Sequence, residues 1–233
     1  MTNNLIVGCS HVEGFELEQE LGYTGIKHTH RDNLTIAAYR KKTRFAAKLA
    51  DRLKIPFSVV SHTGADNSWI TYSTVKHIEE LKAKPKNVIV CLTGITRQQR
   101  YYKGKPYFIN PLYPGHAAEL NKGHNKDAES IVNWELAENR LFLDMNYYLQ
   151  QTYHYVNYLK YFLESKKINF FILKSIENDL DLTQFTPNTL STSFVEFAEA
   201  SNYKKGEYGH FLSEAHNAWA EYIVEQLGDK FKK

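Results

Sequence analysis

Two residues that stand far apart in this chain have side chains that could react together. Ser10 follows the apolar run at residues 5–7 and Gly8, and His210 lies near the other end of the chain. A serine hydroxyl becomes a good nucleophile only when a base removes its proton, and an imidazole is a suitable base. Ser10 could instead cap a helix that begins after the run. The residues alone leave both interpretations open.

The hydrophobic pattern indicates which elements must position Ser10. Four short apolar runs are expected to be buried strands: residues 4–8, 57–61, 87–92 and 169–173. Helical spacing predicts helices over residues 43–54, about 67–83 and 213–227, and two helices or one bent helix within 127–166. Strands that alternate with helices favour a parallel sheet with helices on both faces. All carboxyl ends then share one edge, where such sheets bind ligands.

The length of the chain, 233 residues, suits one α/β domain. We predict a single three-layer α/β/α domain over residues 1–233, built on a flavodoxin-like parallel sheet. Two polar or proline-containing segments, residues 15–42 and 98–126, interrupt the alternation and are expected to be loop insertions. Loops of this length are often functional.

Short motifs at the two ends resemble those of the SGNH or GDSL-type esterases and lipases. The first block of that family is a strand followed by Gly-Asp-Ser, and here it reads Gly8-Cys9-Ser10. The Gly-Cys-Ser form is similar to phage-encoded and bacterial members. The last block of the family is Asp-x-x-His before a terminal helix, and here it reads Glu207-x-x-His210.

The middle blocks depart further from the family. A glycine after the second strand, often followed by Ser-Asn, corresponds to Gly64, with Asn67 three residues on. The third block, Gly-x-Asn-Asp, reads Gly94-Ile95-Thr96-Arg97, so its asparagine is missing. The resemblance covers the motifs at both ends of the chain and the spacing of the strands between them. It does not cover the insertions at residues 15–42 and 98–126.

The resemblance implies a serine hydrolase with defined roles. Ser10 is the expected nucleophile, His210 the base, and Glu207 the carboxylate that orients and stabilises the imidazole. The oxyanion is expected to receive the backbone N–H groups of Ser10 and Gly64 and the side-chain amide of Asn67. Substrate-binding residues are expected next to these, at Thr96 and Arg97. Arg97 could hold an acidic or carbonyl group, or could equally form a salt bridge with a loop.

The composition bears on which partners, compartment and cofactors to expect. A net charge of +3 gives no reason to expect a nucleic-acid partner. The start has no signal-peptide pattern, and no apolar run approaches the roughly 18 residues of a membrane span, so we expect a cytoplasmic protein. The densest histidine pair, His28-x-His30, has no carboxylate or cysteine cluster at ligand spacing. We therefore expect neither a metal nor another cofactor.

Two functions remain open. The first is hydrolysis of a carboxylic ester, such as an O-acetyl group on a carbohydrate, through an acyl-serine intermediate. The second is a weak or inactive protein of the same fold with a structural or interaction role, for example in a phage virion. The missing asparagine and a group of tyrosines support the second. These tyrosines are too closely spaced for one helix face, so some should form a contact surface for a protein partner: Tyr147, Tyr148, Tyr153, Tyr155, Tyr158 and Tyr161.

Overall fold

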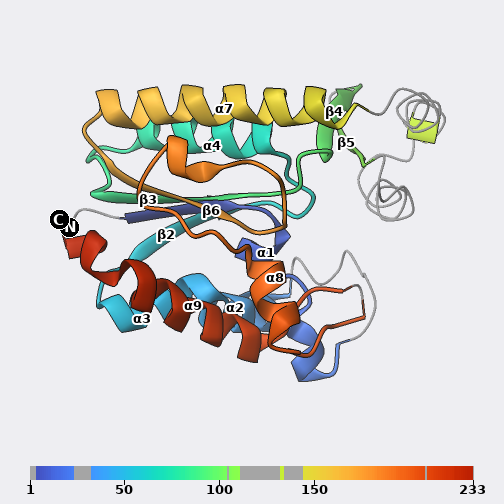
Figure 1. The fold of residues 1–233 in the computed structure, drawn as a ribbon. Coiled ribbons are helices and arrows are strands. Elements are labelled where there is room, and N and C mark those ends of the chain that lie inside the picture. The colour runs from blue at the N-terminus through green and yellow to red at the C-terminus, as the bar shows by residue number, and fades with distance from the viewer. Residues whose placement is uncertain are drawn as a thin grey trace.

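A parallel sheet forms the centre of the protein (Figure 1). The computed structural model describes residues 4–23, 33–103, 105–110, 132–133, 144–207 and 209–232. Within these residues the sheet has the order β2-β1-β3-β6, with all neighbours parallel. The strands are β1 (Asn4–Gly8), β2 (Phe57–Ser61), β3 (Asn87–Leu92) and β6 (Asn169–Lys174). The four predicted strands are confirmed, and β6 runs one residue further than expected.

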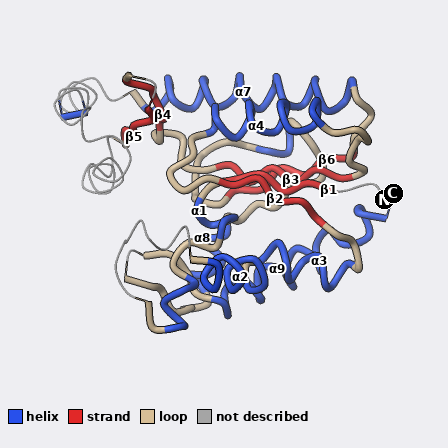
Figure 2. Tube along the Cα trace, turned by 180° about the vertical axis from the view of Figure 1, so that it is seen from behind, coloured by secondary structure: helices blue, strands red, loops and turns tan. Residues whose placement is uncertain are grey.

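Helices cover both faces of the sheet (Figures 1 and 2). On one face lie α4 (Asn67–Glu80) and α7 (Met145–Ser165), packed against each other. On the other lie α2 (Leu34–Thr43), α3 (Phe45–Leu53), α8 (Phe194–Ala200) and α9 (Ser213–Leu227). The predicted three-layer α/β/α architecture is confirmed. The part of residues 127–166 that precedes Asp144 lies outside the described residues, apart from 132–133.

Successive side chains of each strand point to opposite faces of the sheet, and this explains why the protein has one hydrophobic core on each face. In β1, Leu5 and Val7 join the core under α4 and α7, while Ile6 joins the core under α3 and α9. In β3, Val88 and Val90 face the first core and Ile89 the second. Successive side chains of a strand point to opposite faces, so a parallel strand buried on both faces is apolar throughout.

The first insertion is more regular than predicted. Residues 15–42 contain the 3₁₀-helix η1 (Leu17–Leu21) and most of α2, so the loop prediction is wrong there. Asn33 starts α2 by accepting hydrogen bonds from the N–H groups of Thr35 and Ile36. The polar sequence of α2 hides it, because only Ile36, Arg40 and Thr43 are buried. Residues 24–32, which include His28 and His30, lie outside the described residues.

The second insertion begins with a hairpin. β4 (Gln98–Tyr102) pairs antiparallel with β5 (Lys105–Ile109), so the loop prediction is wrong for these residues as well. Pro106 within β5 argued against a strand in the sequence. The hairpin stands at the carboxyl end of the sheet, beside α4 and the start of α7 (Figure 1). Residues 111–126 lie outside the described residues.

Short elements complete the described chain: α1 (Ser10–Glu13), η4 (Leu182–Gln184) and η5 (Gly228–Lys232). Across the described residues, every helix is too short or too polar to cross a membrane.

Candidate active site

Ser10 is the first residue of α1, directly after the end of β1. A Cβ atom on Gly8 would lie 2.4 Å from Cγ2 of Val12 and 3.0 Å from Cβ of Cys91. Only glycine therefore lets α1 start this close to β3. The N-cap residue is Cys9, which makes no side-chain cap. Helix capping by Ser10 is thus the wrong interpretation, and its hydroxyl is engaged elsewhere.

The Ser10 hydroxyl meets His210 in a buried pair. Oγ of Ser10 lies 2.8 Å from Nε2 of His210, so the predicted contact across 200 positions of sequence is confirmed. Ser10 is 1% exposed and His210 is 6% exposed. The other ring nitrogen, Nδ1, lies 3.0 Å from Oε2 of Glu16, which also accepts the backbone N–H of His210 at 2.7 Å. Two contacts from one residue to one oxygen fix both the position and the rotation of the imidazole.

Glu16, rather than Glu207, carries the carboxylate at Nδ1 of His210. Glu207 has an exposed side chain, and its backbone N–H donates to the side-chain oxygen of Gln19 at 3.0 Å. The Gln19 amide in turn donates to Oε1 of Glu16 at 2.7 Å. The prediction that Glu207 lies against the imidazole is therefore wrong. The turn before His210 closes over Glu16 with its backbone instead.

Gly206 makes this close approach feasible. A Cβ atom there would lie 2.8 Å from Oε1 of Glu16 and 2.9 Å from the side-chain oxygen of Gln19. Glu16 itself is 1% exposed and has a φ of 71°, which non-glycine residues rarely adopt. Strained backbone of this kind is found at sites where geometry matters for function. No periodicity marks Glu16 in the sequence, which is why its contact was missed.

Aromatic and imidazole rings enclose His210. The Phe15 ring meets it edge-on at 5.0 Å, and the His11 ring lies 4.8 Å away. His216 is fully buried and accepts the N–H of Phe45 through Nδ1. Burial, with a smaller effect of His210, lowers the pKa of His216 to about 3. His216 is therefore a neutral packing residue.

The expected backbone donors come from neighbouring strand ends. Gly8 pairs with Ser61 in the register of β1 and β2, which puts the loop containing Gly64 beside Ser10. The Thr63 hydroxyl donates to Oε2 of Glu13 at 2.7 Å and ties this loop to α1. The first N–H groups of a helix have no partner within the helix, so the Ser10 N–H is available. Gly64 has a φ of 84°, a conformation that suits glycine.

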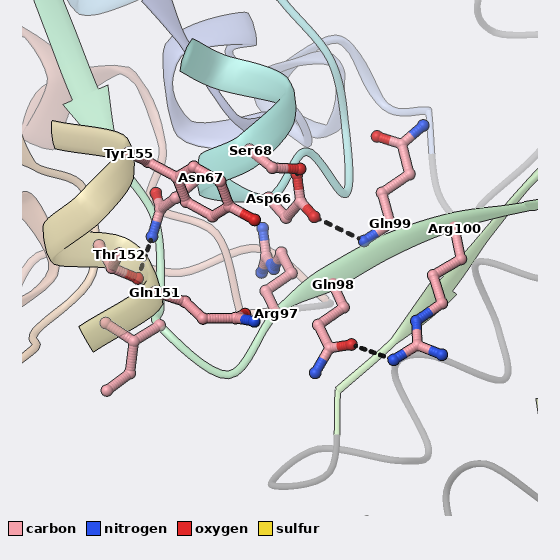
Figure 3. Close-up of a pocket in the computed structure, with 11 residues that line it drawn as sticks. Asp66, Asn67, Ser68, Arg97, Gln98, Gln99, Arg100, Gln151, Thr152 and Tyr155 are labelled. Atoms are coloured by element: carbon pink, nitrogen blue, oxygen red, sulfur yellow. Dashed lines mark hydrogen bonds between the residues drawn. The ribbon is translucent and has the colours of Figure 1, made fainter. Parts of the chain in front are cut away.

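The Asn67 amide does not take the predicted direction. Its oxygen accepts the N–H of Thr93 at 2.9 Å, and its nitrogen donates to the Thr93 carbonyl at 3.2 Å and the Thr152 hydroxyl at 3.5 Å. Figure 3 shows Asn67 facing Thr152. The prediction that this amide serves Ser10 is therefore wrong. It closes the end of β3 instead, while Asp66 caps α4.

A polar pocket of about 200 Å³ lies on this side of the hairpin (Figure 3). At its wall, Oδ2 of Asp66 accepts the N–H of Gln99 at 2.8 Å, which anchors β4 to the start of α4. Burial raises the pKa of Asp66, although the N–H groups of Trp69 and Gln99 oppose this. Arg97 lines this pocket and also the larger cavity described next.

A larger open cavity, about 580 Å³, reaches His210. His11, Thr96, Arg97 and Asn110 also line it. The predicted substrate-binding residues Thr96 and Arg97 therefore share a cavity with the imidazole. Asn110 is a further polar residue there that the sequence did not single out.

Metal-ligand clusters are not found among the residues that the structure describes. Cys9 and Cys91 are free and buried, and burial raises the pKa of the Cys91 thiol.

The tyrosines of α7 include core and surface residues, as predicted: Tyr148 is buried, whereas Tyr147, Tyr158 and Tyr161 are exposed.

The fold has known counterparts in solved structures. A carbohydrate esterase family 2 enzyme with a carbohydrate-binding domain, from Corynascus thermopiles (Myceliophthora fergusii), matches with a TM-score of 0.52 and 12% identity, over 98% of this chain and 67% of that one. A protein assigned to the lipolytic G-D-S-L family of Desulfitobacterium hafniense DCB-2 matches at 0.47 and 12%, over 97% and 99%. An acetyl xylan esterase from the rumen bacterium Butyrivibrio proteoclasticus matches at 0.49 and 14%, over 99% and 65%.

The sequence itself matches no protein-family model, and a search of the curated proteins finds no match. At these identities the likeness concerns the fold. The chain shares the fold of the carbohydrate esterase family 2 enzyme, and its sheet is the parallel sheet that the sequence predicted.

Proposed function

We propose that this protein is a serine hydrolase that cleaves a carboxylic ester through an acyl-serine intermediate. One observation carries the proposal. The hydroxyl of Ser10 lies 2.8 Å from Nε2 of His210, while Nδ1 of the same ring lies 3.0 Å from the Glu16 carboxylate. This is the order nucleophile, base and orienting acid that activates serine in hydrolases of unrelated folds.

In the first half of the reaction, Ser10 is acylated. Its Oγ attacks the ester carbonyl carbon while Nε2 of His210 accepts the hydroxyl proton, and the carbonyl electron pair moves to the oxygen. The imidazolium formed is stabilised by Glu16. The tetrahedral intermediate collapses when the bond to the alcohol oxygen breaks, and that oxygen takes the proton from Nε2.

In the second half, water removes the acyl group. The water oxygen attacks the acyl carbon while His210 accepts a proton from the water. When the second tetrahedral intermediate collapses, His210 returns this proton to Oγ of Ser10 and the carboxylic acid leaves. The negative oxygen of both intermediates needs aimed donors. We assign two of them to the backbone N–H groups of Ser10 and Gly64.

We extend the proposal to O-acetyl groups on a carbohydrate. Polar side chains in the wall of the large cavity, among them Thr96, Arg97 and Asn178, can hydrogen-bond sugar hydroxyls. One protein with the same fold is itself a carbohydrate esterase. Release of acetate from an acetylated oligosaccharide tests this narrower statement.

The activity itself is tested with an aryl acetate. Wild type should release the phenol with a burst that matches the enzyme concentration if deacylation is slower than acylation. Ser10→Ala should abolish release above the rate in buffer. Ser193→Ala, at the capping serine of α8, provides a matched control outside the site. Equal rates for wild type and Ser10→Ala would overturn the proposal.

A second candidate function rests on a separate observation. The Asn67 amide is held by Thr93 and Thr152, and Thr96 occupies the asparagine position of the third block. A protein of this fold without a side-chain oxyanion donor could serve as a structural protein, for example in a virion. Exposed Tyr147 and Tyr158 on α7 would then be its partner surface. Wild type without any esterase activity would favour this function.

A further inference from the structure

The proposed reaction lacks a side-chain donor for the oxyanion at the positions where the sequence predicted one. The Asn67 amide is occupied by the main chain of Thr93. Thr96 has a hydroxyl in place of an amide, and this hydroxyl donates to Oδ1 of Asn110 at 3.2 Å. The hydrogen bond leads from the third block to the inserted hairpin.

The end of the hairpin contacts the carboxyl ends of the two strands that flank β1. Phe108 of β5 stacks on His62, the first residue after β2, with ring centroids 6.1 Å apart. Asn110, two residues on, meets Thr96 beyond the end of β3. In the sheet, β1 lies between β2 and β3. The segment that ends in Asn110 therefore contacts the ends of both strands that flank β1, the strand that Ser10 follows.

Burial and direction favour an inward-pointing amide. Side chains two residues apart in extended chain point to the same side, so Asn110 shares the side on which Phe108 packs. Phe108 is 1% exposed and Asn110 is 8% exposed, and Asn110 lines the cavity that reaches His210. The hairpin therefore turns these side chains toward the sheet edge.

The amide nitrogen of Asn110 has no competing task. The hydrogen bond from Thr96 to Oδ1 fixes the plane of the Asn110 amide and leaves the amide nitrogen, Nδ2, without a bond to Thr96. Among the described residues, Nδ2 donates to no acceptor. By contrast, the nitrogen of Asn67 has two acceptors. Asn110 thus offers an oriented N–H group in the wall of the cavity that reaches His210, and a developing oxyanion requires such a donor.

We propose that Asn110 donates its side-chain N–H to the oxyanion and that Thr96 is the positioning residue that orients it. This inference rests on the proposed esterase function. When Oγ of Ser10 bonds to the carbonyl carbon, the carbonyl oxygen becomes negative and accepts Nδ2–H. An insertion thus supplies the donor that the third block lacks.

Two variants of Asn110 test this role with an aryl acetate. Asn110→Ala removes the amide, and Asn110→Asp keeps the volume and the acceptor for Thr96 but removes the donor. Each should lower kcat by about 10²- to 10³-fold with KM nearly unchanged, because the donor acts on charge that develops in the transition state. Asn146→Ala, at an exposed amide on α7, should keep wild-type kcat.

A boronic acid adds a readout independent of turnover. Phenylboronic acid accepts Oγ of Ser10 at boron and becomes a negatively charged tetrahedral adduct, with the serine proton on His210. Its inhibition constant should rise by about 10²-fold in Asn110→Asp, in step with kcat. Thermal unfolding of Asn110→Asp should stay cooperative, which shows that the chain still folds.

Thr96 variants test the positioning role. Thr96→Val should lower kcat by about five- to tenfold, which corresponds to one neutral hydrogen bond, and Thr96→Ser should restore it. Ser10→Ala is measured in parallel. If Ser10→Ala abolishes activity but Asn110→Asp keeps kcat within about threefold, far below the loss of one oxyanion donor, this inference fails and the proposed function stands. If Ser10→Ala has no effect, the proposed function fails.

Discussion

The two sides of Ser10 differ in how completely their polar atoms are paired. On the side of His210, a continuous series of hydrogen bonds runs through Glu16 to Gln19. On the side of β3, two buried polar atoms that can donate have no hydrogen-bond partner among the described residues: Oγ1 of Thr93 and Nη1 of Arg97. The hydrogen bonds on the side of His210 are complete, whereas the side of β3 has unused hydrogen-bond donors.

This difference agrees with the hydrolase activity that we propose. The base must be oriented before substrate arrives, so its partners belong to the protein. The oxyanion forms only during the reaction, so its donors must wait for a partner. Buried polar groups without partners are rare and need an explanation, and a substrate that brings its own oxygen atoms provides one here.

The largest expected effect comes from replacing His210, which lies between Ser10 and Glu16 in the hydrogen-bonded series. His210→Gln removes the base but keeps a polar side chain of similar size. Hydrolysis of an aryl acetate should fall by about 10⁴-fold or more, the loss seen when one member of such a unit is removed. A loss of less than tenfold would show that His210 does not act as the base.

Changing the acid sharpens the comparison between two glutamates. Glu16→Gln should lower kcat by about 10²- to 10⁴-fold, because a neutral amide can hold the wrong tautomer of His210. Glu207→Gln, the matched control, should stay within about threefold, the range of an exposed residue outside the site. The same assay measures both, and the reverse order of effects would return the acid role to Glu207.

The sequence predicted the scaffold better than the site. The strands are visible because burial on both faces makes them apolar throughout, as in residues 87–92. The terminal helix is visible because one buried face imposes a helical period, as in residues 213–227. Ser10 and His210 were found because they follow such elements. The sequence did not single out Glu16 and Asn110, because each lies in an insertion, where position depends on tertiary contacts and no period marks the residue.

A smaller effect is expected from crowding the turn over Glu16. Gly206→Ala puts a Cβ atom 2.8 Å from Oε1 of Glu16, and the carboxylate must shift. The free energy of unfolding should fall by about 1–3 kcal/mol, as in other overpacked sites, and kcat should fall with it. Gly228→Ala is the control, because its nearest atom would lie at 3.4 Å. If Gly206→Ala is as stable as wild type in urea denaturation, the close contact between residue 206 and Glu16 is refuted.

The last expected effect concerns pH and His216, a buried imidazole whose pKa is lowered partly by His210. Its pKa is about 3 in the fold, against 6.5 for a free imidazole. Between these values the unfolded chain binds one proton more, so the free energy of unfolding should decrease as pH falls from about 6.5 toward 3. His216→Phe should flatten this slope by up to about 1.4 kcal/mol per pH unit. An unchanged slope in urea titrations at several pH values would contradict a buried neutral His216.

Covalent labelling of Ser10 tests the central claim most directly, because it needs no knowledge of the natural substrate. A fluorophosphonate should modify wild type once per chain, and peptide mass spectrometry should place the adduct on Ser10. The labelling rate should drop sharply in His210→Gln and in Glu16→Gln and stay unchanged in Glu207→Gln. An adduct on another residue, or equal rates in wild type and His210→Gln, would contradict the assignment of Ser10, His210 and Glu16 as one catalytic unit.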